Sequence, residues 1–136
     1  MNTFKDATTE EINAIMEQSW NAFETYRTFS LQQRAGFIHA IATALGSISE
    51  AVVAAAMKET HLPEARLNNE LTRTIFQLNS YADACKQGNW IEARIDTAIT
   101  ERNPSKPDLR KMLVPLGPVV VFGASNFPFA YSTAGG

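Results

Sequence analysis

The chain has 136 residues, the length of one ordinary domain, and 45% of them are hydrophobic, which is enough for a sizeable core. A net charge of −2 gives no support to nucleic-acid binding, which needs a basic surface. No apolar run approaches the ~18–20 residues of a membrane span, and the N-terminus lacks the apolar stretch of a signal peptide. Cys85 is the single cysteine and cannot form an intramolecular disulfide. These features predict a cytoplasmic protein with no nucleic-acid or membrane partner.

Residues 1–90 are predicted to form a helical part with four helices. The first opens at Thr8, with Glu11 three residues later in a capping-box pattern. Its apolar face recurs at helical spacing in Ile12, Ile15, Met16, Trp20 and Phe23. The second opens at Ser30, with Gln33 in the same relation, and should end at Gly46. Its apolar face consists of Phe37, Ile38, Ile41 and Leu45. The aromatic residues of these faces, Trp20, Phe23 and Phe37, are expected in the core.

Ser47 with Glu50 predicts the start of a third helix, which is rich in alanine and should end near Thr60. A fourth helix follows Leu62-Pro63 and should end at Gly88. One of its faces carries Leu67, Leu71, Ile75, Leu78, Ala82 and Cys85.

Several polar residues of the helical part are better explained by structure than by catalysis. Cys85 lies near a helix C-terminus, where the dipole disfavours a thiolate, so a buried or half-buried thiol is expected. His39 and His61 lack a metal-ligand partner at the required spacing on their own helix, which favours partly buried or capping roles and predicts no metal site. We expect solvated or interfacial charges at Arg66, Arg73 and Arg94.

Residues 91–116 are predicted to form a β-ribbon. Apolar and polar residues alternate from Ile91 to Thr100, which is typical of a strand with one covered face. A polar, proline-bearing loop follows over 102–108, and the segment 109–116 can return as a second strand that Pro115 interrupts.

Residues 117–136 are predicted to form a strand, a tight turn and the start of a helix. Val119–Phe122 is an unbroken apolar run that fits a strand of a parallel sheet, and Gly123 permits a sharp turn. Pro128 suits the first turn of a helix. This arrangement presents backbone N–H groups to ligands in α/β folds, although the dinucleotide fingerprint GxGxxG is absent.

Two segments of the chain resemble the aldehyde dehydrogenase superfamily, and the branch of ketoglutarate-semialdehyde and long-chain fatty aldehyde dehydrogenases is the most similar. The resemblance rests on Pro115-Leu-Gly-Pro-Val119 and on Phe122-Gly-Ala-Ser-Asn-Phe-Pro128, continuing through Ala134-Gly-Gly136. A weaker match covers Lys58–Leu67, where His61 stands in place of a glycine that is common in the family. The chain corresponds to the N-terminal part of a far longer family protein.

The resemblance implies a parent of the α/β class with a Rossmann-type cofactor domain, of which this chain is a mainly α-helical part. It also implies that the Asn126 side-chain amide helps form an oxyanion hole, and that Phe122, Gly123, Ala124, Ser125 and Asn126 pass beside the nicotinamide of NAD or NADP. The family's nucleophilic cysteine, its general-base glutamate and its binding segments for the adenosine and pyrophosphate lie further along. The substrate would be a small aldehyde, and a ribbon like 91–116 would join a neighbouring subunit of a homo-oligomer.

Asn126 has a second interpretation from its chemistry alone. An asparagine just before Phe127 could cap a helix, because its side chain accepts hydrogen bonds from backbone N–H groups two or three residues later. Residue chemistry by itself favours that cap, whereas the surrounding motif favours the oxyanion donor.

Two expectations concern the chain by itself. It should neither reduce NAD(P) with an aldehyde nor bind the cofactor tightly, because the catalytic cysteine and glutamate are missing. The run Val119–Phe122 should be mobile, pair with the preceding ribbon or join a second copy, since buried backbone needs partners. The alternative to an enzyme is a non-enzymatic helical interaction module with a ribbon tail, or a decayed remnant.

Overall fold

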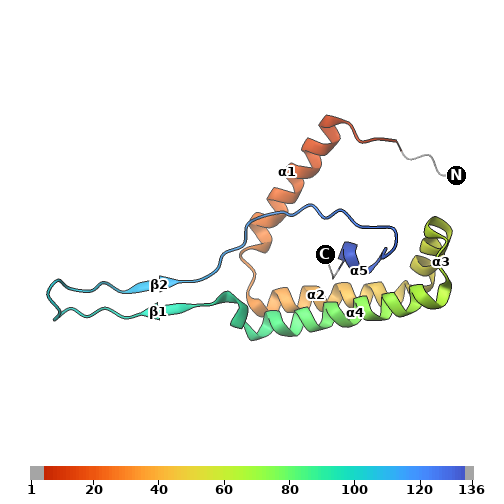
Figure 1. Ribbon diagram of the computed structural model, residues 1–136. Coiled ribbons are helices and arrows are strands. Elements are labelled where there is room, and N and C mark those ends of the chain that lie inside the picture. Colours follow the sequence, from red (N-terminus) through yellow and green to blue (C-terminus); the bar gives the residue numbers. More distant parts are fainter. Residues whose placement is uncertain (1–4, 134–136) are drawn as a thin grey trace. The chain divides into compact units, whose positions relative to one another are not determined.

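A computed structural model describes residues 5–133, and the chain divides into two compact units. One unit holds the residues up to Phe29 together with Pro115–Val120, and the other holds Ser30–Val114 with the residues from Val121 on. The described part is mainly helical with one small sheet, as predicted (Figure 1). In chain order its elements are α1 (Thr9–Tyr26), α2 (Leu31–Ser47), α3 (Ser49–Thr60), α4 (Glu64–Gln87), the 3-10 helix η1 (Asn89–Ile91), β1 (Arg94–Asp96), β2 (Leu109–Lys111) and α5 (Ala130–Thr133).

The core of the larger unit lies where α2 and α3 pack against α4. Helices α2 and α4 run side by side (Figure 1). Ala42 of α2 and Leu78 of α4 form one buried cluster, and three half-buried residues pack against it: Ile38, Leu45 and Ile75. Nearer the start of α4, Leu67 and Leu71 pack against Val53 and Ala56 of α3. The face predicted for α4 is therefore confirmed as the centre of the core.

Local capping signals explain most of the helix ends. Thr8 and Glu11 form the predicted capping box, in which Glu11 N donates to Thr8 Oγ1 at 3.2 Å and Thr8 N donates to Glu11 Oε2 at 2.8 Å. Ser30 and Gln33 form the second one. Gly88 ends α4 with φ 75°, a left-handed conformation that glycine adopts without a steric penalty.

The boundary between α2 and α3 differs from the prediction. Helix α2 runs through Gly46 and ends at Ser47, so Gly46 is not its cap. The Ser47 hydroxyl donates back to Ala44 O at 2.7 Å and does not cap α3, whose N-cap residue is Ile48. A serine at the end of one helix can satisfy a carbonyl of that helix, which here competes with capping the next one.

The apolar face of α1 is mostly exposed. Helix α1 has no buried residue, and Trp20 is 52% exposed, so the prediction of a core position for Trp20 is wrong. Phe23 is half-buried, with its ring centroid 5.4 Å from that of Trp20. In the same unit a Cβ placed on Gly117, whose φ is 127°, would lie 3.5 Å from the Trp20 ring. Phe37, on α2 in the other unit, is also exposed and not a core residue.

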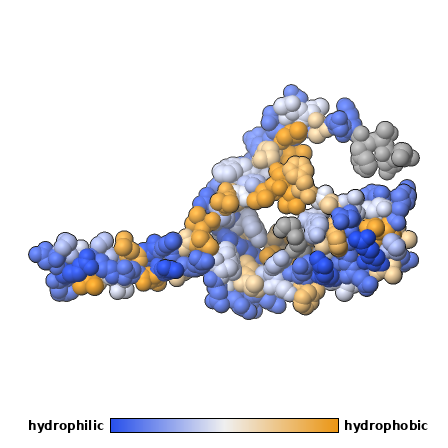
Figure 2. Space-filling view, viewed as in Figure 1, coloured by the Kyte–Doolittle hydropathy of each residue, from blue (hydrophilic) through white to orange (hydrophobic). Residues whose placement is uncertain are grey.

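The predicted ribbon is present, but its regular part is short. Strands β1 and β2 pair antiparallel in the register Arg94↔Lys111, Ile95↔Arg110 and Asp96↔Leu109. An isolated bridge joins Ile99 and Lys106 beyond them, and Lys106 forms an ion pair with Asp96. A cis peptide precedes Pro104 in the connecting loop. All six strand residues are exposed, and hydrophobic and hydrophilic residues share the ribbon surface (Figure 2). The face of the first strand that was predicted to be covered is therefore not covered by residues 5–133.

The run Val119–Phe122 is not a strand in this structure. Its side chains are 53–92% exposed, and the sheet of the described residues contains β1 and β2 alone. It does not pair with the ribbon, which was one of the three expected outcomes. The apolar sequence favours a strand, but a strand needs a partner for its backbone groups.

No single helix in residues 5–133 is long and apolar enough to cross a membrane; α2 and α3, bent by 71° at their junction, meet those criteria of length and composition only as a pair.

Candidate active-site turn

The segment Gly123–Phe129 forms a turn that leads into α5. Phe127 N donates to Ala124 O at 3.1 Å, and α5 begins at Ala130, later than the start at Phe127 that the sequence suggested. A Cβ placed on Gly123 would lie 2.1 Å from Ser132 Oγ. The chain therefore folds closely back on itself here, and glycine provides the space that this approach needs.

Asn126 is exposed within this turn, and its backbone is held while its side chain is not. Its carbonyl oxygen accepts a hydrogen bond from Arg66 Nη2 at 2.6 Å. No hydrogen bond joins its side-chain amide to any residue between 5 and 133. The capping bond that residue chemistry favoured is therefore not formed in the described structure, and the amide is available to an external acceptor.

Arg66 of α4 fixes the turn, although the sequence predicted only a solvated or interfacial charge for it. Besides its hydrogen bond to Asn126 O, its guanidinium lies 5.2 Å from the ring centroid of Phe127, a cation–π distance. The Phe127 ring in turn lies 5.0 Å from that of Tyr131 in α5. Arg66 therefore contacts both the residue that carries the candidate amide and the residue after it.

Glu70 holds the next part of the same segment and was missed by the sequence reasoning. It is 6% exposed, and its Oε1 accepts hydrogen bonds from the backbone N–H groups of Phe129 and Ala130, both at 2.9 Å. The first N–H groups of a helix have no partner within that helix, so a carboxylate acceptor from α4 satisfies them. Its other oxygen, Oε2, is buried without a hydrogen-bond partner in the described structure.

A signal for Glu70 was present in the sequence. Glu70 lies on the α4 face between Leu67 and Leu71, so a charged residue occupies the stripe that was predicted to be buried. Buried carboxylates are rare unless they are paired or hydrogen-bonded, so the position indicates a distant backbone or cationic partner. The identity of that partner depends on the fold, because Ala130 is 60 residues away in the chain.

An open pocket of about 230 Å³ lies where α4 meets the turn. Its walls come from Arg66, Asn69, Glu70, Arg73 and Phe127. Just before Asn126 in the sequence, Phe122 is 92% exposed, and Gly123, Ala124 and Ser125 are exposed too.

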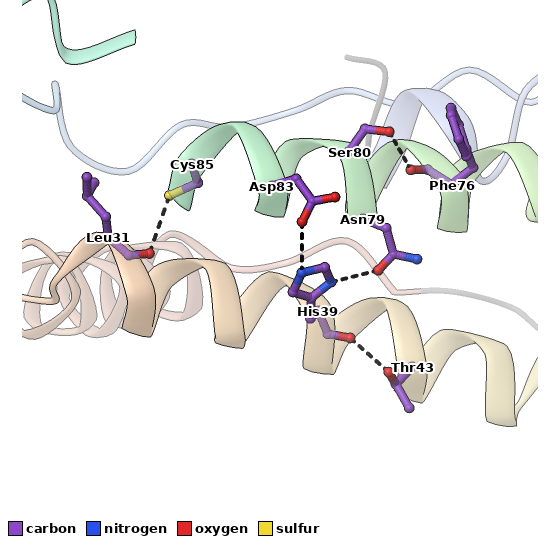
Figure 3. A network of polar contacts seen from close by, with 8 residues as sticks. All are labelled: Leu31, His39, Thr43, Phe76, Asn79, Ser80, Asp83 and Cys85. Atoms are coloured by element: carbon purple, nitrogen blue, oxygen red, sulfur yellow. Dashed lines mark hydrogen bonds and ion pairs between the residues drawn. The ribbon is translucent and has the colours of Figure 1, made fainter. Parts of the chain in front are cut away.

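The histidines and the cysteine have the structural roles that were expected. His39 of α2 lies between two side chains of α4, with Nδ1 2.8 Å from Asn79 Oδ1 and Nε2 3.5 Å from Asp83 Oδ1 (Figure 3). Cys85 is half-buried, and its Sγ lies 3.9 Å from Leu31 O (Figure 3). His61 caps α3 with φ 58°. No cluster of three potential metal ligands occurs in the part of the chain that the structure describes.

The aldehyde dehydrogenase family matches residues 1–135, almost the whole chain. This chain belongs to that family. It is 42% identical over 134 residues to an alpha-ketoglutaric semialdehyde dehydrogenase of Acinetobacter baylyi, and the match covers 98% of this chain and 26% of the relative. It is 43% identical, with the same coverage, to alpha-ketoglutaric semialdehyde dehydrogenase 2 of Azospirillum brasilense. The chain therefore spans about a quarter of the length of these relatives, and the resemblance inferred from its motifs is confirmed.

Proposed function

We propose that the full-length protein oxidises an aldehyde to a carboxylic acid with NAD or NADP, and that Asn126 donates its side-chain amide to the substrate oxygen. This proposal rests on the hydrogen bonding of Asn126. Its carbonyl is bound to Arg66, whereas its amide is free of the described residues. Family membership supports an enzyme over the helical interaction module, and nothing in the core of α2, α3 and α4 requires the latter.

The chemistry asks for a donor of this kind. When a nucleophile adds to an aldehyde, negative charge develops on the carbonyl oxygen. A donor that is fixed before the reaction stabilises this charge without reorganising, and losing one such donor typically lowers kcat by ~10²–10³. An amide suits the role because it donates and stays neutral. The nucleophile and the general base would come from other parts of the full-length protein.

NAD(P) supplies a hydride acceptor when it is bound. The residues of this chain that would contact it are Phe122, Gly123, Ala124, Ser125 and Asn126. The exposed Phe122 ring and the Ser125 hydroxyl fit one wall of a nicotinamide pocket. We infer no further contact, since the groups for the adenosine and the pyrophosphate are not among these residues.

The relatives suggest the first substrate to test. Both are named for alpha-ketoglutaric semialdehyde, and a long-chain fatty aldehyde is the other candidate that the resemblance allows. A panel of these and other aldehydes with NAD and NADP, followed by absorbance of the reduced cofactor, would identify both the substrate and the preferred cofactor.

The decisive experiment is Asn126→Ala in the full-length protein. We expect kcat to fall ~10²–10³-fold while the KM for the aldehyde changes little, because the amide acts on charge that develops in the transition state. Asn68→Ala is the matched control: Asn68 is an exposed asparagine of α4, and its substitution should leave both constants unchanged. Full turnover of the Asn126 variant would refute the oxyanion role.

A homo-oligomer is part of the same proposal. We divide the chain into a helical part of the cofactor domain (1–90), a ribbon of the oligomerisation region (91–116) and the first strand, turn and helix of the cofactor domain (117–136). Support comes from the exposed β1 and β2 side chains, among them Ile95 at 68% and Leu109 at 54%. Light scattering on the full-length protein should report an assembly that Ile95→Asp and Leu109→Asp weaken, while Arg94→Asp does so less.

A further inference from the structure

We propose that Arg66 and Glu70 are positioning residues for the Asn126 amide, acting together from one face of α4. The inference rests on the proposed function, because it assigns these residues a role through the oxyanion donor. They lie four residues apart on the helix, so both side chains project from the same side one turn apart.

The first argument is that the two side chains bind opposite ends of the segment 126–130. Arg66 binds Asn126 O at 2.6 Å, and Glu70 binds Phe129 N and Ala130 N at 2.9 Å. Two residues of one helix therefore fix the backbone at both ends of the stretch 126–130 through three hydrogen bonds. All three join charged groups to backbone atoms, which makes them stronger than neutral hydrogen bonds.

The second argument is the rigidity of the element that carries these side chains. Glu70 lies between the core residues Leu67 and Leu71, which are 0% and 3% exposed. Thr74, also fully buried, donates its hydroxyl to Glu70 O at 2.9 Å. The carboxylate therefore projects from the buried face of α4, and it binds the backbone of a segment whose Phe129 also packs against that core. A site built on a packed helix holds its geometry better than one that relies on a loop alone.

The third argument is the cost of burying Glu70. A buried carboxylate is unfavourable unless its oxygens are hydrogen-bonded, yet Oε2 has no partner among the described residues. A residue selected only for packing here would be apolar, like its neighbours on the stripe. The bonds that justify the charge are those from Oε1 to the backbone after Asn126.

The placement of an oxyanion donor is sensitive to small displacements, since a shift of about 1 Å can lower the rate ~10²-fold. In the full-length enzyme we expect Glu70→Ala and Arg66→Met each to lower kcat by about 10-fold to 100-fold. The KM for the aldehyde should change less than 3-fold, roughly, since ground-state binding does not depend on the donor. Glu70→Gln keeps an oxygen that can accept from Phe129 N and Ala130 N, and should retain most of the activity.

The test is a double-mutant cycle with Asn126→Ala. If Arg66 and Glu70 act through the amide, neither substitution will lower kcat further once the amide is gone. A purely structural role would lower kcat by the same factor in both backgrounds. Lys86→Met is the control for Arg66→Met: Lys86 is an exposed cation of the same helix that does not line the pocket beside the turn, and its loss should leave kcat unchanged.

The outcomes separate this inference from the proposed function. If Asn126→Ala lowers kcat but Arg66→Met and Glu70→Ala add their full factors to it, the positioning role is refuted and the oxyanion role stands. The positioning role is also refuted if Glu70→Gln is as harmful as Glu70→Ala. Should Asn126→Ala leave kcat unchanged, both proposals fail. Because Glu70 is buried and its alanine variant can misfold, the cycle with the exposed Arg66 decides the question independently.

Discussion

Helices α4 and α1 have similar sequence patterns and very different surroundings. Each carries apolar residues at helical spacing, yet α4 buries six residues and α1 buries none. Ile12, Ile15 and Met16 of α1 are between 46% and 58% exposed, whereas Leu67 of α4 is 0% exposed. Periodicity identifies the face of a helix that seeks a partner. Whether the partner lies in the same chain is a separate question, which periodicity does not answer.

The largest expected difference between the two helices is in the effect of removing one apolar side chain. Leu67→Ala should lower the free energy of unfolding of the chain by about 3 kcal/mol, because it leaves a cavity between α3 and α4. Ile15→Ala, at a site that is 58% exposed, should change it by less than about 0.5 kcal/mol. Urea unfolding followed by circular dichroism measures both. Equal losses would show that α1 has a buried partner.

The two capping boxes give a smaller test of the same contrast. Ser30→Ala should lower the free energy of unfolding by about 1 kcal/mol, because α2 unfolds together with the core. Thr8→Ala removes a cap with the same geometry, but it should chiefly fray α1. Amide hydrogen exchange resolved by residue distinguishes the two: protection should fall throughout the core for Ser30→Ala and only in α1 for Thr8→Ala. A global loss in both variants would contradict the separation into two units.

The end of α3, which belongs to the core, offers a substitution that should raise the free energy of unfolding. His61 has φ 58°, a conformation that costs a residue with a Cβ roughly 1 kcal/mol. His61→Gly should raise the free energy of unfolding by about 0.5–1 kcal/mol, as measured by urea unfolding. Thr60→Gly, one residue earlier and still helical, should lower it by about 1 kcal/mol. If both variants lose stability, the left-handed cap is not strained.

The smallest expected effect is in the loop of the ribbon. A hydrogen bond from the backbone, and a second from the Thr100 hydroxyl at 2.9 Å, hold the pKa of Glu101 below its usual value. Because folding lowers the pKa of Glu101, these hydrogen bonds contribute to stability above the pKa of the unfolded state, which is ~4.3. That contribution is lost as the pH falls through the pKa of the folded state. Amide chemical shifts of the loop should therefore change below about pH 4 in the wild type and not in Glu101→Gln, while the shifts of α4 stay constant. A transition that persists in the variant would belong to another group.

The features that could be predicted from the sequence are those that depend on contacts between residues a few positions apart. Thr8, Ser30 and Gly88 act on their nearest neighbours, so their roles could be inferred without the fold. Even such local predictions can be wrong: the Ser47 hydroxyl could have capped the next helix, but it donates to Ala44 O. The core positions of Leu67 and Leu78 followed from the length of the α4 pattern.

The features that could not be predicted depend on contacts between distant segments. The motif around Asn126 identified the turn, but nothing in that motif indicates that Arg66 and Glu70 hold it. The prediction of core positions for Trp20 and Phe37 was wrong because large aromatic residues are usually buried, whereas these two are 52% and 51% exposed. Val119–Phe122 was identified as strand-forming, but its pairing needs another strand.

This last run has a practical consequence for handling the polypeptide. Three valines and a phenylalanine in succession combine high β-propensity with no charge, and their backbone groups are unpaired within the described sheet. Such a stretch can pair with the backbone of other chains, so we expect concentrated solutions of these 136 residues to aggregate. Val120→Lys would place a charge within the run and should reduce this aggregation, which the yield of soluble protein measures.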